Sequence, residues 1–210
     1  VASGFAGAFS GRLDPVWVVR LGLVAEIVGV AAIGFAIGPD AAWGWLLPAL
    51  FVYGFGVGLA TAQLTGVVLS EVPVAESGQA SGTQSTSRQV GSALGIAILG
   101  TILFTTTAGV LGAKLDDRGV PAAERDAIVS SVVDSAGASI AGLEKAPATK
   151  DAAADAKAAF SDGTRYAAWS AAGFLALGLV ATLTLGSSRT PREEDERAES
   201  SAGAAPPPSA

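Results

Sequence analysis

The sequence predicts an all-α fold, a polytopic bundle of membrane helices, and three observations support that prediction. The chain is 50% hydrophobic but only 15% charged, whereas soluble domains average about 25% charged residues. The charges are clustered, because the stretch from Leu21 to Thr107 contains one arginine, Arg88, no lysine and four acids. Four apolar segments come close to the length of about 20 residues that an α-helix needs to cross a bilayer core.

The four predicted spans follow one another along the chain. They cover Val16–Ile37, Trp43–Leu69, Val90–Thr107 and Tyr166–Gly186. Val1–Ser10 is apolar but too short to cross a bilayer. We therefore expect residues 1–107 to hold the end of one helix and three complete spans. The absence of methionine leads us to expect that the chain begins inside a longer protein.

A small and polar stretch, from Glu76 to Gln89, runs without a proline into the third span. In one interpretation a continuous helix begins in a cytoplasmic vestibule, where its polar side chains line an aqueous cavity, because unpaired polar groups facing lipid are costly. In the other, an ordinary cytoplasmic loop leads to a span that starts at Val90. The side chains expected to face a cavity or a bound small molecule are Gln63, Gln84, Arg88 and Gln89. Gln63 has the alternative of bonding to a neighbouring helix.

Residues 108–165 are polar and are expected to form an extracellular loop that contains amphipathic helices. Pro121 suits the first turn of a helix, and Pro147 ends that helix. Apolar residues between the two prolines recur at helical spacing; they are Ile128, Val129, Val132, Val133, Ile140 and Leu143. A second, alanine-rich helix is expected to continue past Phe160 into the last span. We expect these helices to lie on the outer face of the bundle rather than to form a separate binding domain.

The positions of the basic residues predict the orientation of the chain. Short cytoplasmic loops collect lysine and arginine. If the four helices alternate in direction, one group falls on the same side of the membrane: Arg12, Arg20, Arg88, Arg189, Arg192 and Arg197. We therefore expect a multi-pass protein of the plasma membrane with a cytoplasmic C-terminus. Residues 187–210 form an acidic, proline-ended tail that is predicted to be disordered.

Glycines at close spacing predict where helices pack. Lipid gives apolar helices no hydrophobic reason to associate, so small residues that permit close backbone approach are favoured at their contacts. The glycines predicted to pack helices together are Gly54, Gly58, Gly78, Gly82, Gly91 and Gly95. A dinucleotide site is excluded for these runs, because no strand precedes them and no acidic ribose partner follows.

Glu26 is the acidic residue that falls inside a predicted span. A charge at the centre of a membrane helix costs about 2.5–3.5 kcal/mol on insertion scales, so such a residue suggests a function. Its position six residues after Arg20 corresponds to about 9 Å along a helix, which places it off-centre, towards the cytoplasm. Two roles remain open: a proton-coupling carboxylate, or an interfacial acid paired with a neighbouring basic residue.

Several classes of function are excluded by composition. The chain has no cysteine and no histidine, which removes disulfides, thiolate metal sites and histidine acid–base chemistry. No nucleophile–base pair and no phosphate loop occurs, so we expect no enzyme, no cofactor and no metal. The net charge of −6 argues against nucleic acid as a partner.

Two motifs carry a resemblance to a known family. The run from Val72-Pro73 through Gly78-x-Ala-Ser-Gly82 to Arg88-Gln-x-Gly91-x-Ala-Leu-Gly95 resembles the penultimate helix of major facilitator superfamily exporters, in the subgroup of 14-helix drug:proton antiporters. A second run, Gly11, Arg12 and Asp14 followed by Arg20, resembles a cytoplasmic loop motif of the same superfamily. Its usual Asp-Arg pair is replaced here by Asp14-Pro15.

The resemblance covers about residues 1–190 and implies a C-terminal fragment of a multidrug-type exporter. It implies export of small, hydrophobic or cationic compounds by proton antiport. The implied partners are the lipid bilayer, the missing N-terminal helices and, in the complete protein, a small-molecule substrate and protons. Alternating access needs two halves that rock around a midplane site, so this chain alone is not expected to transport. The alternative is a small stand-alone oligomeric membrane protein whose extracellular loop binds a partner.

Overall fold

The computed structural model describes residues 15–39, 43–69 and 72–183, and these residues form helices and turns with no strand. The elements are α2 (Pro15–Ala36), α3 (Trp43–Leu69), η1 (Val74–Glu76), α4 (Ser77–Asp117), α5 (Ala122–Asp134), α6 (Ile140–Leu143), η2 (Pro147–Thr149) and α7 (Lys150–Leu183). Among them α2, α3, α4 and α7 are long and apolar enough to cross a membrane. The predicted all-α class and its four membrane helices are confirmed.

Two of the helices extend far beyond their predicted spans. α4 has 41 residues, which corresponds to about 60 Å and so to about twice the thickness of a bilayer core. It begins at Ser77, inside the polar stretch. The structure therefore has the continuous helix and not a loop that leads to a span at Val90. α4 also continues past Thr107 to Asp117, and α7 begins at Lys150. Both ends of the predicted loop therefore belong to the long helices.

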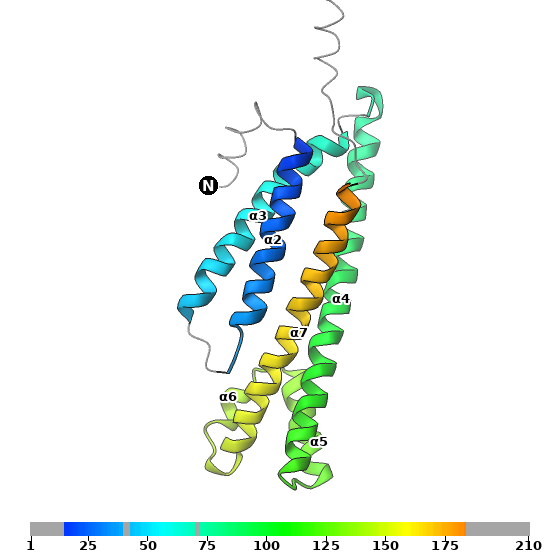
Figure 1. Cartoon of the computed structure of the whole chain (residues 1–210). Coiled ribbons are helices and arrows are strands. Elements are labelled where there is room, and N and C mark those ends of the chain that lie inside the picture. Colours follow the sequence, from blue (N-terminus) through cyan, green and yellow to red (C-terminus); the bar gives the residue numbers. More distant parts are fainter. Residues whose placement is uncertain (1–14, 40–42, 70–71, 184–210) are drawn as a thin grey trace, which may run out of the picture.

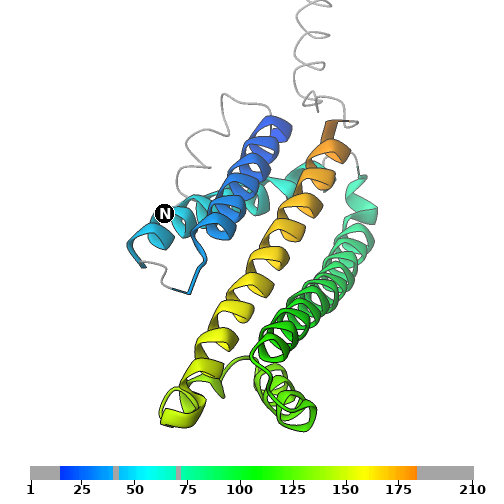
Figure 2. The same cartoon turned by 60° about the horizontal axis from the view of Figure 1, so that its bottom comes forward.

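The four long helices form a curved row in the order α3, α2, α7, α4. α2 packs along α3 and along α7, and α7 packs along α4, whereas α3 and α4 meet at few points. Figures 1 and 2 both show α7 between α2 and α4. The described end of α3 and the start of α4 approach each other where the chain passes from one to the other through η1 (Figure 1).

Glycine brings α2 and α3 together, but through other residues than predicted. A Cβ on Gly22 would lie 2.7 Å from the backbone N of Ala60, and one on Gly29 would lie 2.6 Å from the backbone N of Tyr53. A Cβ on Gly56 would lie 2.6 Å from the backbone N of Glu26. At these distances the backbones would have to move apart, so glycine is what permits the contact.

Five of the six predicted packing glycines meet no other helix in the described residues. A Cβ would meet no atom within 4 Å at five of them: Gly54, Gly78, Gly82, Gly91 and Gly95. The sixth, Gly58, is half-buried in α3. Helical geometry gives the reason in α3, because Gly56 faces α2 and the glycine two residues before it is turned by about 200° to the other side. Packing against helices outside the chain stays a prediction.

Two arginines join the ends of the antiparallel pair α2 and α7. Arg165 donates from Nη2 to the carbonyl oxygen of Ile37, at 3.0 Å, just after α2 ends. Arg20 donates from Nη2 to the carbonyl oxygen of Thr182, at 2.7 Å, in the last turn of α7. The last carbonyls of a helix have no partner within it and carry partial negative charge, so each arginine stabilises the end of the opposite helix.

The segment 108–165, which we call the cap, has a hydrophobic core of its own. The ends of α4 and α7 contribute Leu111, Leu115, Ala156 and Ala159, and α5 contributes Val132; all five are fully buried. α5 packs on α4, and α6 packs on α7 (Figure 1). The predicted apolar face is used here, since Ile128, Val129, Ile140 and Leu143 pack against this core. The extended α4 and α7 thus give these helices an apolar surface to cover, and their place on the outer side of the membrane stays a prediction.

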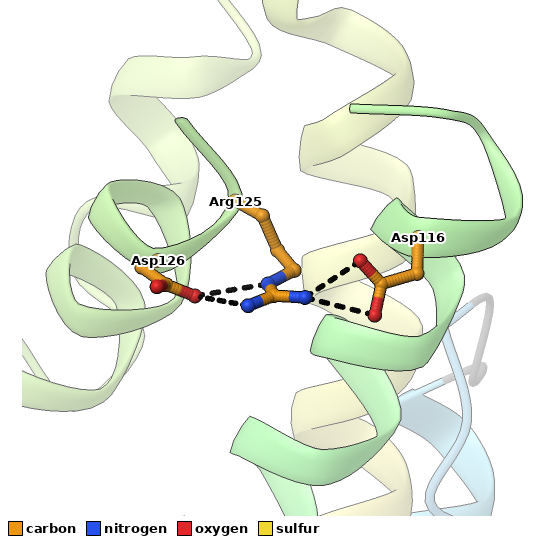
Figure 3. Close-up of polar contacts among 3 residues, drawn as sticks. All are labelled: Asp116, Arg125 and Asp126. Atoms are coloured by element: carbon orange, nitrogen blue, oxygen red, sulfur yellow. Dashed lines mark hydrogen bonds and ion pairs between the residues drawn. The ribbon is translucent and has the colours of Figure 1, made fainter. Parts of the chain in front are cut away.

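Ion pairs and a glycine turn close the cap around this core. Arg125 donates to both carboxylate oxygens of Asp116, at 2.7 and 3.0 Å, and pairs with Asp126 (Figure 3). These hydrogen bonds, Asp116 first, raise the pKa of the Arg125 guanidinium. Arg118 pairs with Asp155 of α7. α4 ends in a turn in which Gly119 has φ +74° and Val120 donates to the carbonyl oxygen of Leu115, at 3.0 Å, the Schellman arrangement that favours glycine.

Candidate functional site

A cavity of about 480 Å³ lies between the four long helices. We call it the apolar cavity. Its lining comes from all four helices: Glu26, Val30, Tyr53, Gly91, Leu94, Gly95, Ile98, Leu99, Ala171, Phe174 and Leu175. Apolar and aromatic side chains dominate, with one carboxylate and one phenol among them, which is the composition expected of a small-molecule site.

Glu26 is held in the wall of this cavity by the close contact of α2 with α3. A Cβ on Gly56 would lie 2.9 Å from Cγ of Glu26, so the absence of a side chain there gives the glutamate its room. Glu26 is the twelfth of the 22 residues of α2. It therefore lies at the middle of α2 as the structure describes it, and its off-centre depth in the bilayer stays a prediction. Arg20, from which that position was measured, already lies inside α2.

The carboxylate of Glu26 has no ion pair or hydrogen bond within the part of the chain that the structure describes. A charge at the middle of a membrane helix is costly unless it is paired or solvated. The arrangement therefore suits a group that exchanges a proton or binds a cation. It gives no support, in the described residues, to the alternative of a paired interfacial acid.

A second cavity, of about 620 Å³, lies at the N-terminal end of α4. We call it the polar cavity. Its described lining is Val72, Glu76, Gln79, Ala80, Thr83, Gln84 and Ser87. Gln84 also donates from Nε2 to Oγ1 of Thr65, at 3.4 Å, and so connects α4 to α3. One face of the polar half of α4 thus lines a hollow.

The other polar candidates lie elsewhere. Arg88 and Gln89 are exposed on α4, and neither lines one of these two cavities. Gln89 follows Ser87 by two residues, so helical geometry turns it away from the face that lines the polar cavity. Gln63 is half-buried in α3 and lines neither cavity.

The cytoplasmic loop motif is described only at its last residue. Gly11, Arg12 and Asp14 lie outside the described residues. Arg20 lies in α2, where its guanidinium is 5.5 Å from the ring centre of Trp17 and bonds to the end of α7. The apolar helix end expected before Gly11 and the tail expected after residue 186 also lie outside the described residues.

Sequence reasoning missed the apolar half of the site. Tyr53 and Phe174 line the apolar cavity, and so do Gly91 and Gly95, where a Cβ would meet no described atom within 4 Å. No local signal marks Tyr53 or Phe174, because apolar aromatics are ordinary in a membrane helix. The glycine pair was visible in the sequence, but spacing alone does not tell whether a glycine face meets a helix or a cavity. No group of three or more metal-ligating side chains occurs in the described residues.

Comparison with known proteins gives a consistent set of relatives. The chain is 30% identical over 190 residues to the multidrug resistance protein Stp of Mycobacterium tuberculosis, which covers 88% of this chain and 33% of that protein. It is 34% identical over 99 residues to a probable actinorhodin transporter of Streptomyces coelicolor, covering 46% of this chain and 17% of that protein.

The chain is similar to multidrug and antibiotic efflux transporters. The drug efflux pump JefA of Mycobacterium tuberculosis is a further relative, 31% identical over 136 residues, with 65% of this chain and 26% of that protein covered. The chain spans about a third of the length of Stp and less of the other two. No protein-family profile matches the sequence. No solved structure matches it.

Proposed function

We propose that this chain supplies the C-terminal helices of a membrane exporter of small, hydrophobic or cationic compounds, driven by proton antiport. The proposal includes the major facilitator superfamily, its 14-helix drug:proton antiporter subgroup, the plasma membrane, a cytoplasmic C-terminus and a cap on the outer side. The similarity to efflux transporters supports export. The fractional coverage of those relatives supports a chain that acts with further helices.

The observation that carries the proposal is the single carboxylate in an apolar cavity lined by all four long helices. Ionised Glu26 attracts a cation into this cavity, where Tyr53 and Phe174 offer aromatic faces to it. Protonated Glu26 loses that attraction, so arrival of a proton favours release. One group that holds either a proton or a cation is sufficient to couple the movement of the proton to the movement of the cation.

Replacement of Glu26 by glutamine tests this role. We expect Glu26→Gln in the complete protein to slow export of ethidium from cells by about tenfold or more, equivalent to about 1.4 kcal/mol of lost stabilisation. The residual export should no longer depend on the proton gradient. Fluorescence of ethidium in cells, followed after a step in external pH, measures both quantities.

Glu124→Gln is the matched control, because Glu124 is exposed on α5 in the cap. It should leave the rate and its pH dependence unchanged. If the wild-type protein still exports ethidium after the proton gradient is collapsed, proton antiport is removed from the proposal. An unchanged rate and pH dependence in Glu26→Gln would remove Glu26 from the coupling.

A second candidate is the small stand-alone oligomer with a partner-binding outer segment. The observation in its favour is the cap, whose buried core could present α5 and α6 as a fixed surface. It predicts that the 210-residue chain, purified alone in detergent, forms a discrete oligomer by light scattering. The exporter proposal predicts aggregation or degradation, because faces of α3 and α4 stay uncovered.

A further inference from the structure

The two cavities share one face of α4. Helical residues three and four apart lie on the same side, and the α4 residues that line the cavities follow that spacing throughout. In the polar cavity they are Gln79, Ala80, Thr83, Gln84 and Ser87, and in the apolar cavity they are Gly91, Leu94, Gly95, Ile98 and Leu99. Glu76, just before α4, continues the series. We call this strip the α4 face.

The α4 face changes character along its length. Amide and hydroxyl side chains cover it up to Ser87, and glycine and aliphatic residues cover it from Gly91 onwards. A Cβ on Gly91 or Gly95 would meet no atom within 4 Å. These two glycines therefore widen the hollow beside α4 at the level where Glu26 and Tyr53 face it from α2 and α3.

The charges that line the two cavities in the described residues have one sign. Among the described residues that line the two cavities, the charged ones are Glu76 and Glu26, and both are acids. From the level of Glu76 to that of Gly95 is 19 residues, or about 28 Å along the helix axis. A cation is attracted by a carboxylate near each end of this path, whereas an anion is repelled by both carboxylates.

We propose that the α4 face is one continuous route on which a lipophilic organic cation binds first beside Glu76, in the polar cavity, and then beside Glu26, in the apolar cavity. Gly91 and Gly95 set the width of the route. This inference rests on the proposed function and adds to it a first binding site and a path. The amide and hydroxyl groups near Glu76 replace water around the cation before it reaches the apolar part.

The chain contains no cysteine, so single cysteines can be introduced as reporters without altering its background. The complete protein, with any cysteine outside this chain changed to serine, is placed in lipid nanodiscs that leave both membrane faces open. Ser87→Cys, Gly91→Cys and Ile98→Cys report on the route. Gln89→Cys, Ala93→Cys and Ile96→Cys are matched controls on the opposite side of the same helix.

A charged, water-soluble methanethiosulfonate reagent should label the three route positions at least about tenfold faster than the three controls, since it reacts with the thiolate, which forms in water and not in lipid. Tetraphenylphosphonium should slow labelling at the route positions. Triphenylphosphine oxide, neutral and of similar shape, should not. Glu76→Gln should weaken protection at Ser87→Cys, and Glu26→Gln should weaken it at Gly91→Cys and Ile98→Cys.

Equal and slow labelling on both sides of α4 would overturn the route, because it would mean that another helix or lipid fills this face. Protection by the neutral compound as well would overturn the choice of a cation. Labelling needs no proton gradient, so it can be measured apart from export. If the protein exports but the route positions are not labelled faster than the controls, the route is wrong and the proposed function stands. If the labelling pattern is as expected but the protein does not export, the proposed function is wrong.

Discussion

At the scale of single residues, the closest helix contacts occur where glycine removes a side chain. Gly163 of α7 is buried against α4, where a Cβ would reach the side-chain oxygen of Thr107 and lie 2.6 Å from the carbonyl oxygen of Leu103. Thr107 itself is fully buried and donates to that same carbonyl, at 2.8 Å. The contact therefore has no room for even one methyl group.

We expect Gly163→Ala to destabilise the protein by about 1–3 kcal/mol relative to Gly178→Ala, because it forces α4 and α7 apart. The control lies in the same helix, and a Cβ there would meet no atom within 4 Å. Both changes gain the same helix propensity, about 1 kcal/mol, so their difference isolates the steric effect. Unfolding midpoints in detergent measure it, and equal midpoints would contradict the contact.

At the scale of elements, α2 and α7 are joined by complementary ends as well as by packing. Phe35 meets Trp169 edge-to-face, with ring centres 4.4 Å apart, a favourable arrangement of aromatic rings. Arg165 bonds to Ile37, just after the end of α2, and Arg20 bonds to the last turn of α7. Each arginine thus brings its charge to the C-terminal end of the opposite helix.

Loss of the Arg165 contact should weaken this pair. We expect Arg165→Ala to lower the free energy of unfolding by about 1 kcal/mol, the value typical of a charged group at a helix C-terminus. Lys157→Ala is the control, since Lys157 is an exposed basic residue of the same helix. Hydrogen exchange at the amides of the last turn of α2 should rise in the first variant only. No rise there would show that the contact does not hold the helix end.

At the scale of the whole molecule, the described chain has two differently built parts. The cap has a small core of fully buried residues. The bundle buries little of its apolar surface, and large side chains such as Phe51, Ile96 and Leu177 stay exposed. Such faces suit lipid or further helices, so the bundle depends on its surroundings more than the cap does.

A substitution that leaves a cavity in the core of the cap should therefore destabilise the cap without destabilising the bundle. We expect Leu115→Ala to cost about 2–5 kcal/mol, because Leu115 is fully buried and the space cannot collapse completely. Leu177→Ala is the control, with its side chain 66% exposed. Hydrogen exchange should rise in α5 and α6 but not in α3. An equal rise in α3 would mean that cap and bundle unfold as one unit.

Particular residues show how far the sequence could predict the site. The polar stretch before Val90 left two interpretations open, a cavity-lining helix or a loop; the structure has the helix, and Gln84 of that helix lines the polar cavity. Gly22, Gly29 and Gly56 were as visible as the glycines that were chosen, but one glycine looks like another until the facing helix is known. Glu26 was found, because a lone acid in an apolar span is conspicuous. The residues that line its cavity from the other helices were not found, because they come from α3, α4 and α7.

By itself, the sequence determined the class of fold, since a stretch so poor in charge is stable only where hydrocarbon surrounds it. It also showed which stretches next to the spans are polar, but not that they are helical. Only the tertiary structure decided which glycines face a neighbouring helix, that the cap has its own core, and that Glu26 shares a cavity with Tyr53 and Phe174. The physical reason is that helix formation depends on local spacing, whereas contacts between helices depend on the relative rotation and position of segments far apart in the chain.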